Sequence, residues 1–75
     1  MVRMIRKIIR VHRRDSAFVY AILESLEGMT SYGTLPDAKS HDYRLLELSI
    51  SPGYAAEMEV ILNGLRTKFP IIELT

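Results

Sequence analysis

The sequence predicts an α+β fold in which two helices cover one face of a four-stranded antiparallel sheet. Its 75 residues are expected to form one domain over 1–75, because they are too few for two separate cores. Apolar residues make up 48% and charged residues 25%, which is typical of a globular chain. Four segments show the alternation of strands and two show helical spacing, and their order along the chain indicates the fold class.

The first expected element is a strand over 5–12, where apolar and polar residues alternate. Ile9 and Val11 mark the face turned toward the core, and Lys7 is a charged exception on that face. The opposite face carries Arg6, Ile8, Arg10 and His12.

A helix is expected over 16–27. Asp15 or Ser16 can cap it, because either side chain can accept a hydrogen bond from the free N–H groups of a first turn. Gly28 can end it in the left-handed conformation. The apolar residues at helical spacing are Phe18, Ile22 and Leu26, with Val19 and Leu23 beside them.

Two strands are expected next, over 29–35 and 43–50, joined by a polar connection with turn-forming residues. Gly33 either weakens the first of these strands or marks a bulge in it. In the second, one face is apolar and consists of Leu46, Leu48 and Ile50. The other face carries Tyr43, Leu45, Glu47 and Ser49.

A second helix begins after Ser51, a natural N-cap, with Pro52 at its first position. Pro70 ends it near Phe69. Its apolar stripe consists of Tyr54, Met58, Ile61, Leu62, Leu65 and Phe69. A last strand is expected over 71–74, with Ile72 and Leu74 directed inward.

This β-α-β-β-α-β order is the split-βαβ, ferredoxin-like arrangement. Right-handed crossovers would place both helices on one side of the sheet, and the expected strand order is 4-1-3-2. The other sheet face would then be open. We predict that it forms an interface through Arg6, Ile8, Arg10, Tyr43, Leu45 and Glu47.

The first strand and its flanks are basic, since six of the ten Lys and Arg residues fall within the first 14 positions. Arg6 and Arg10 are expected to be solvated or to pair with Glu47 and Glu73. Self-association through Ile8, Leu45 and Ile71 is a second interpretation. RNA binding is the alternative, but it needs aromatic rings for base stacking, and these two strands offer only a tyrosine at an edge.

Residues that could support catalysis are scarce, so we predict neither an enzyme nor a bound cofactor. There is no cysteine, the two histidines are far apart in the sequence, and no glycine-rich phosphate loop occurs. Asp37, His41 and Asp42 could hold a metal weakly, but solvated loop acids are the favoured interpretation and no metal site is predicted. The longest apolar run, Ala17–Leu23, is too short to span a membrane, and no signal peptide pattern occurs. We therefore expect a cytoplasmic protein.

The turn between the first strand and the first helix is the predicted ligand site. Cations beside a helix N-terminus oppose the helix dipole, so a sequence that keeps them there can use them to hold a carboxylate or phosphate. The residues concerned are His12, Arg13, Arg14, Asp15 and Ser16.

The run Arg14–Phe18, the segment Ile22–Gly28, Thr34-Leu35 and Ser51-Pro52-Gly53 resemble a small family of bacterial stand-alone domains of unknown function. That family is similar in topology to ACT domains, which are regulatory βαββαβ modules that bind small ligands and usually pair side by side. The resemblance implies a non-enzymatic regulatory module that acts as a homodimer.

ACT domains place their ligand at the turn after the first strand, typically with an Asp-Arg-x-Gly motif. Here that turn reads Arg13-Arg14-Asp15-Ser16, so Arg13 replaces the leading acid and Ser16 replaces the glycine. The resemblance therefore implies a small anionic ligand, or a protein partner, rather than the ammonium group of an amino acid.

Overall fold

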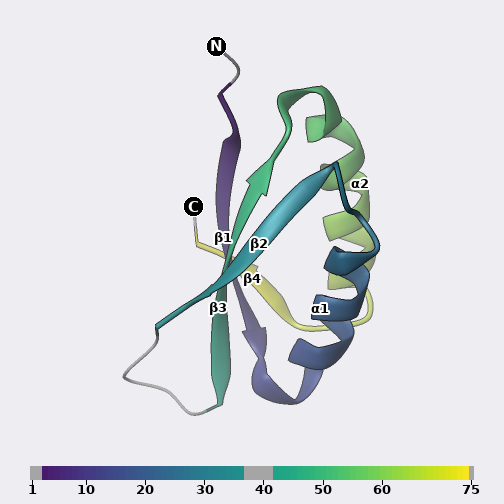
Figure 1. The fold of residues 1–75 in the computed structure, drawn as a ribbon. Coiled ribbons are helices and arrows are strands. Elements are labelled where there is room, and N and C mark those ends of the chain that lie inside the picture. Colours follow the sequence, from purple (N-terminus) through teal and green to yellow (C-terminus); the bar gives the residue numbers. More distant parts are fainter. Residues whose placement is uncertain (1–2, 37–41, 75) are drawn as a thin grey trace.

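A computed structural model describes residues 3–36 and 42–74 (Figure 1). Its elements are β1 (Ile5–His12), a 3₁₀ turn η1 (Arg13–Asp15), α1 (Ser16–Glu24), β2 (Thr30–Leu35), β3 (Tyr43–Ile50), a second 3₁₀ turn η2 (Pro52–Tyr54), α2 (Ala55–Arg66) and β4 (Ile71–Glu73). Both helices pack against the same face of the sheet. The α+β class with an open four-stranded sheet is therefore confirmed.

The sheet is antiparallel throughout, with the order β2-β3-β1-β4. Read from the opposite edge, this is the series 4-1-3-2, with β1 and β3 in the centre. Ile9 pairs with Leu46 across the central strands, and Thr30 pairs with Ile50 at the β2 side. The arrangement is compatible with a ferredoxin-like description.

The core lies between the sheet and the helices. Directly paired residues of an antiparallel sheet share a face, so the pairing of Ile9 with Leu46 places both toward the helices. The buried apolar residues are Ile9, Val11, Val19, Leu23, Leu46, Leu48, Ile50, Met58, Leu62, Leu65 and Ile71. The predicted core faces of the first and third strands are thus confirmed.

Lys7, the charged exception on the core face, lies within an ionic cluster at the β4 side of the molecule. Its Nζ atom is 2.6 Å from a Glu59 carboxylate oxygen and 2.5 Å from one of Glu73. Arg66 donates to the second Glu73 oxygen at 2.8 Å. Hydrogen bonds to Glu59 and Glu73 raise the pKa of Lys7, and the hydrogen bond from Lys7 lowers the pKa of Glu73. The expected pairing of Glu73 with arginines of the open face was wrong, because Glu73 pairs with Ile9 in register and so faces the helices.

The first helix differs from its prediction in three respects. It ends at Glu24 rather than at 27, and turns lead from there to Gly28, which has the expected positive φ of 88°. Among the described residues Asp15 forms no side-chain cap bond, because η1 precedes the helix and His12 caps that turn instead. Phe18 was expected in the core stripe but is 63% exposed, since Val19 and Leu23 are the residues directed at the sheet.

In the last strand, the residues that face inward and those that face outward are exchanged relative to the prediction. Ile71 pairs with Val11 and is buried, whereas Ile72 and Leu74 are 46% and 47% exposed. Their inward assignment was therefore wrong, and so was the placement of Ile71 on the open face. The register of β2 runs continuously from Thr30 to Leu35, so Gly33 occupies an ordinary strand position rather than a bulge.

The second helix follows its prediction more closely. Pro52 opens η2, and the buried residues of α2 are Met58, Leu62 and Leu65. Tyr54, the first residue of the predicted stripe, is exposed. The helix ends at Arg66 rather than near Phe69, with Thr67 as its C-cap.

Candidate functional site

The predicted ligand residues His12–Ser16 lie together in the turn between β1 and α1. Backbone and side-chain hydrogen bonds hold this turn, among them one from the Ser16 N–H to the Arg13 carbonyl. The Arg14 N–H donates to Nδ1 of His12 at 3.3 Å, the Ser16 hydroxyl donates to the Arg13 carbonyl at 2.7 Å, and the Arg13 N–H donates to the Asp42 carbonyl at 2.7 Å. His12 and Ser16 therefore shape the turn, while the arginine side chains supply its surface charge.

Asp15 partly offsets that charge. Its Oδ1 atom lies 4.0 Å from Nε of Arg14, whose side chain is 72% exposed. Its Oδ2 atom is buried and has no hydrogen-bond partner among the described residues. The turn is thus a solvent-facing cationic surface with one acid beneath it, and its role as a ligand site stays a prediction.

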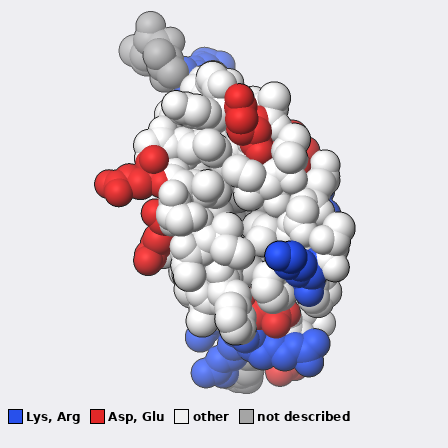
Figure 2. Space-filling model, turned by 90° about the vertical axis from the view of Figure 1, so that its right-hand side faces the viewer, with Lys and Arg blue, Asp and Glu red and all other residues white. Residues whose placement is uncertain are grey.

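Charge is unevenly distributed over the helix layer, as Figure 2 shows: most basic residues gather at one end with some acidic residues among them, the other acidic residues lie nearer the opposite end or along one side, and the centre is uncharged. The exposed cations of the basic end are Arg13, Arg14 and Lys68. The exposed acids of the other end are Glu24, Glu27 and Glu57. These residues flank the helix ends, because α1 runs away from the basic end and α2 runs toward it.

The uncharged middle of the helix layer includes a large exposed aromatic side chain. Phe18 stacks on Phe69 with ring centroids 6.1 Å apart, and Ala17 and Ala21 on the same helix are also exposed. We call the exposed residues Ala17, Phe18 and Ala21 the α1 surface. Within α1 only the last residue, Glu24, carries a charge.

On the open sheet face, the structure brings together several of the predicted interface residues. Arg6 forms an ion pair with Glu47, and its Nε donates to the same carboxylate at 2.6 Å. The Arg10 guanidinium lies 4.5 Å from the centroid of the Tyr43 ring, and the His12 ring meets that tyrosine edge-on at 5.4 Å. Pairing of Arg6 with Glu47 was expected; the stacking of Arg10 on Tyr43 was not.

The rest of the open face carries aliphatic residues and, toward the β2 side, Ser31 and Ser49. In register, Arg10 lies between Leu45 and Ile72, and Ile8 lies beside Glu47. Ile8 and Leu45 are half-buried. This face therefore combines two engaged arginines with aliphatic side chains rather than a row of aromatic rings.

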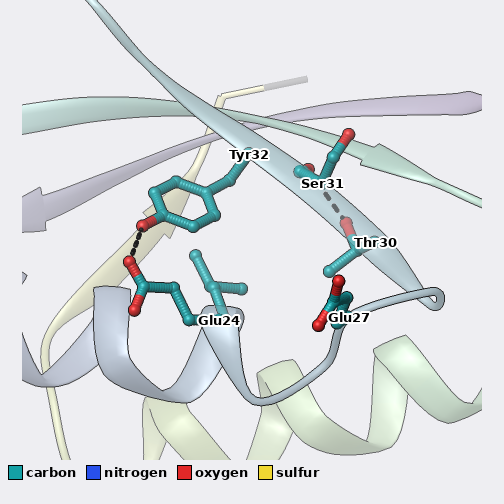
Figure 3. A pocket seen from close by; sticks show the side chains of 6 residues that line it. Glu24, Glu27, Thr30, Ser31 and Tyr32 are labelled. Carbon is teal, nitrogen blue, oxygen red and sulfur yellow. Dashed lines mark hydrogen bonds between the residues drawn. The ribbon is translucent and has the colours of Figure 1, made fainter.

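A pocket that the sequence did not indicate lies between the C-terminal end of α1 and β2 (Figure 3). It has a volume of 510 Å³ and is lined by Leu23, Glu24, Glu27, Thr30, Ser31 and Tyr32. The Tyr32 hydroxyl donates to Glu24 at 2.8 Å, which raises the pKa of Tyr32. Tyr20 stacks on Tyr32 with centroids 5.4 Å apart. No motif marks these residues; only the approach of β2 to the end of α1 creates the pocket.

The next features are possible metal ligands and helices long enough to span a membrane. Asp37 and His41, two of the residues weighed as weak metal ligands, lie outside the described residues. Among residues 3–36 and 42–74, no group of three His, Asp or Glu side chains is placed to hold a metal ion. In that part of the chain, neither helix has the length and apolar content needed to cross a bilayer.

Comparison with family models, curated proteins and solved structures finds no match to this chain. The resemblance to a bacterial ACT-like family therefore stays a prediction from the sequence. What the structure itself shows is a small α+β domain with an open four-stranded sheet.

Proposed function

We propose that this chain is a non-enzymatic binding module that acts as a homodimer, with α1 at the centre of the subunit interface. The observation that carries the proposal is the exposure of Phe18. A phenylalanine side chain in water forgoes about 2 kcal/mol of burial free energy, and covering it with a second subunit would recover much of this.

Charge favours a second copy of this chain as the occupant of that surface. A two-fold axis that lies parallel to the helix layer and at right angles to its long direction would place the basic end of each subunit against the acidic end of the other. Arg14 would then face Glu27 across the interface, so the separated charges of Figure 2 become complementary.

The size of the molecule is sufficient for such an interface. Its extents are 37 × 25 × 19 Å. A broad face of these dimensions can supply the roughly 800 Å² per partner that stable complexes usually bury.

The ligand site expected at the β1–α1 turn fits this proposal. The turn directly precedes α1, so an interface centred on that helix places Arg13 and Arg14 at the subunit boundary. We propose that a small anionic ligand bound there would contact both subunits and so regulate their association. This regulatory role is the ACT-like element of the proposal.

Solution mass tests the homodimer. We expect light scattering over a dilution series to show a dimer for the wild-type chain and a monomer for Phe18→Asp at the same concentrations. Val60→Asp is the matched control, because Val60 is similarly exposed but lies on α2. A wild-type chain that is monomeric at every concentration would overturn the proposal, and so would a Phe18→Asp chain that dimerises as well as wild type.

Nucleic-acid binding through the open sheet face is the second candidate. The exposed Tyr43 ring beside Arg10 and His12 favours it, since such a group can stack on a base near a phosphate. Pairing of Arg6 with Glu47 and the aliphatic Ile72 argue against an extended nucleic-acid surface. If single-stranded RNA binds at low salt and is released steeply as salt rises, and Tyr43→Ala abolishes this, the open face is the functional one.

A further inference from the structure

We propose that the two α1 helices of the dimer pack antiparallel, and that Arg14 of each subunit enters the pocket between Glu24 and Glu27 of its partner. This inference rests on the proposed homodimer and specifies its contacts. It gives a role to two features that have none within a single subunit: the charges at the ends of α1 and the pocket at its C-terminal end.

The charges at the ends of α1 oppose the helix dipole. A helix favours acids at its N-terminus and bases at its C-terminus. In α2 this rule holds, with Glu57 in the first turn and Arg66 in the last. In α1 two cations, Arg13 and Arg14, precede the helix against one acid, Asp15 at the N-cap, and the acid Glu24 ends it. Charges that weaken their own helix are expected to interact with something outside it.

An antiparallel pairing of α1 brings these opposite charges together. A two-fold axis between Tyr20 and Ala21 places Arg14 opposite the partner's Glu27, because both lie equally far along the chain from that axis. At a helical rise of about 1.5 Å per residue, α1 extends about 6 Å to either side of the axis, and Arg14 and Glu27 lie in the turns just beyond its two ends. The exposed Ala17 and Ala21 side chains near the axis are small enough for two helices to approach closely.

The pocket suits an arginine side chain. Figure 3 shows Glu24 and Tyr32 on one side of the pocket and Glu27 on the other. Glu24 and Glu27 can accept from a guanidinium, and Leu23 and the Tyr32 ring provide an apolar wall for its stem and planar face. The hydrogen bond from Tyr32 holds Glu24 in place.

Charge-reversal variants test this pairing. In Arg14→Glu and in Glu27→Arg, like charges would meet at both symmetric contacts. We expect each variant to raise the dimer dissociation constant at least about tenfold. The double variant, which restores opposite charges, should return to within about threefold of wild type. Arg6→Glu, the same charge change on the open sheet face opposite the helices, should leave the constant unchanged.

A mixture of the two single variants gives a sharper test. In the heterodimer of an Arg14→Glu chain with a Glu27→Arg chain, both contacts join opposite charges. Equal mixing should therefore produce heterodimers in preference to either homodimer, as native mass spectrometry would show. Circular dichroism of each variant alone establishes that the fold is intact.

The possible failures can be distinguished. If wild type is monomeric throughout, the homodimer and this inference both fail. If wild type dimerises but the single variants dimerise equally well, or their mixture shows no preference for heterodimers, the homodimer stands and the pairing of Arg14 with Glu27 is overturned.

Discussion

The two helices pack on the same sheet but present different surfaces to solvent. The outer side of α2 carries Val60 among the polar residues Glu57, Asn63 and Arg66, with charges placed to suit the helix dipole. The outer side of α1 carries Ala17, Phe18 and Ala21, with charges placed against the dipole. The difference indicates that α2 is suited to contact with water and α1 to contact with another protein surface.

The largest effect is expected from a comparison of the two sides of α1. Leu23 is buried, so Leu23→Ala should lower the free energy of unfolding by about 3 kcal/mol. Phe18→Ala should lower it by about 1 kcal/mol or less, mainly through loss of the stacking with Phe69. Urea denaturation at concentrations where the chain is monomeric measures both values. Equal losses would contradict the assignment of Phe18 to an outer surface.

A smaller effect on stability is expected from the ionic cluster that joins α2 to the sheet. Glu73→Gln removes the carboxylate that binds Lys7 and Arg66, and should cost about 1 kcal/mol at neutral pH. In α1 the corresponding contact involves one charged group, the Glu24 carboxylate, which accepts a hydrogen bond from Tyr32 of β2. Thermal unfolding should therefore show a clearly lower Tm for Glu73→Gln. A Tm unchanged from wild type would contradict a stabilising role for the cluster.

The pH dependence of the same variant sharpens this comparison. The pKa of Glu73 is lowered in the folded state, so its contribution is present above the unfolded pKa of about 4.5 and is lost as pH falls through the lower folded pKa. The pKa of Lys7 is raised, so its contribution is present below 10.5 and is lost as pH rises through the higher folded pKa. Glu73→Gln should flatten the acid side of the stability profile; an unchanged acid side would count against this linkage.

The smallest effect on stability is expected when one charge is removed near the N-terminus of each helix and the two changes are compared. At concentrations where the chain is monomeric, Arg14→Gln should raise stability by about 0.3 kcal/mol, because it removes a cation from a helix N-terminus. Glu57→Gln should lower it by about the same amount, because it removes a favourable anion. Changes of the same sign, measured by urea denaturation, would show that the charges of the two helices are not placed differently.

Much of the fold could be predicted because local signals agreed with long-range packing. The strand Tyr43–Ile50 has the predicted bounds, since its alternation is strict and one face is fully apolar. Pro52 and Gly28 also stand where their backbone preferences require, at the start of η2 and at the one positive φ among the described residues. Each of these features depends on residues close together in the sequence.

The incorrect predictions arose where either of two neighbouring apolar residues could have faced the core. In α1, Phe18 and Val19 both fit a helical stripe, and only packing on the sheet selects Val19 and Leu23. In β4, a three-residue strand is too short for its alternation to show which isoleucine faces inward, and pairing of Ile71 with Val11 decides it. Both choices depend on residues distant in the sequence.

In the candidate site, too, the features set by nearby residues could be predicted and those set by distant residues could not. The basic turn and the open-face residues could be predicted from local composition and strand alternation. The pocket at the end of α1 could not, because it depends on where β2 passes that helix end. The stacking of Arg10 on Tyr43 likewise depends on the register between β1 and β3.

The most direct test of the central claim, that α1 is the surface where two copies meet, is a cysteine cross-link. The chain contains no cysteine, so Ala21→Cys introduces a single thiol beside the proposed two-fold axis. Mild oxidation at low micromolar concentration should convert this variant largely to a disulfide-linked dimer, while Ala56→Cys on α2 stays monomeric under the same conditions. Equal cross-linking of both variants, or none of Ala21→Cys at concentrations where the chain is dimeric, would contradict the claim.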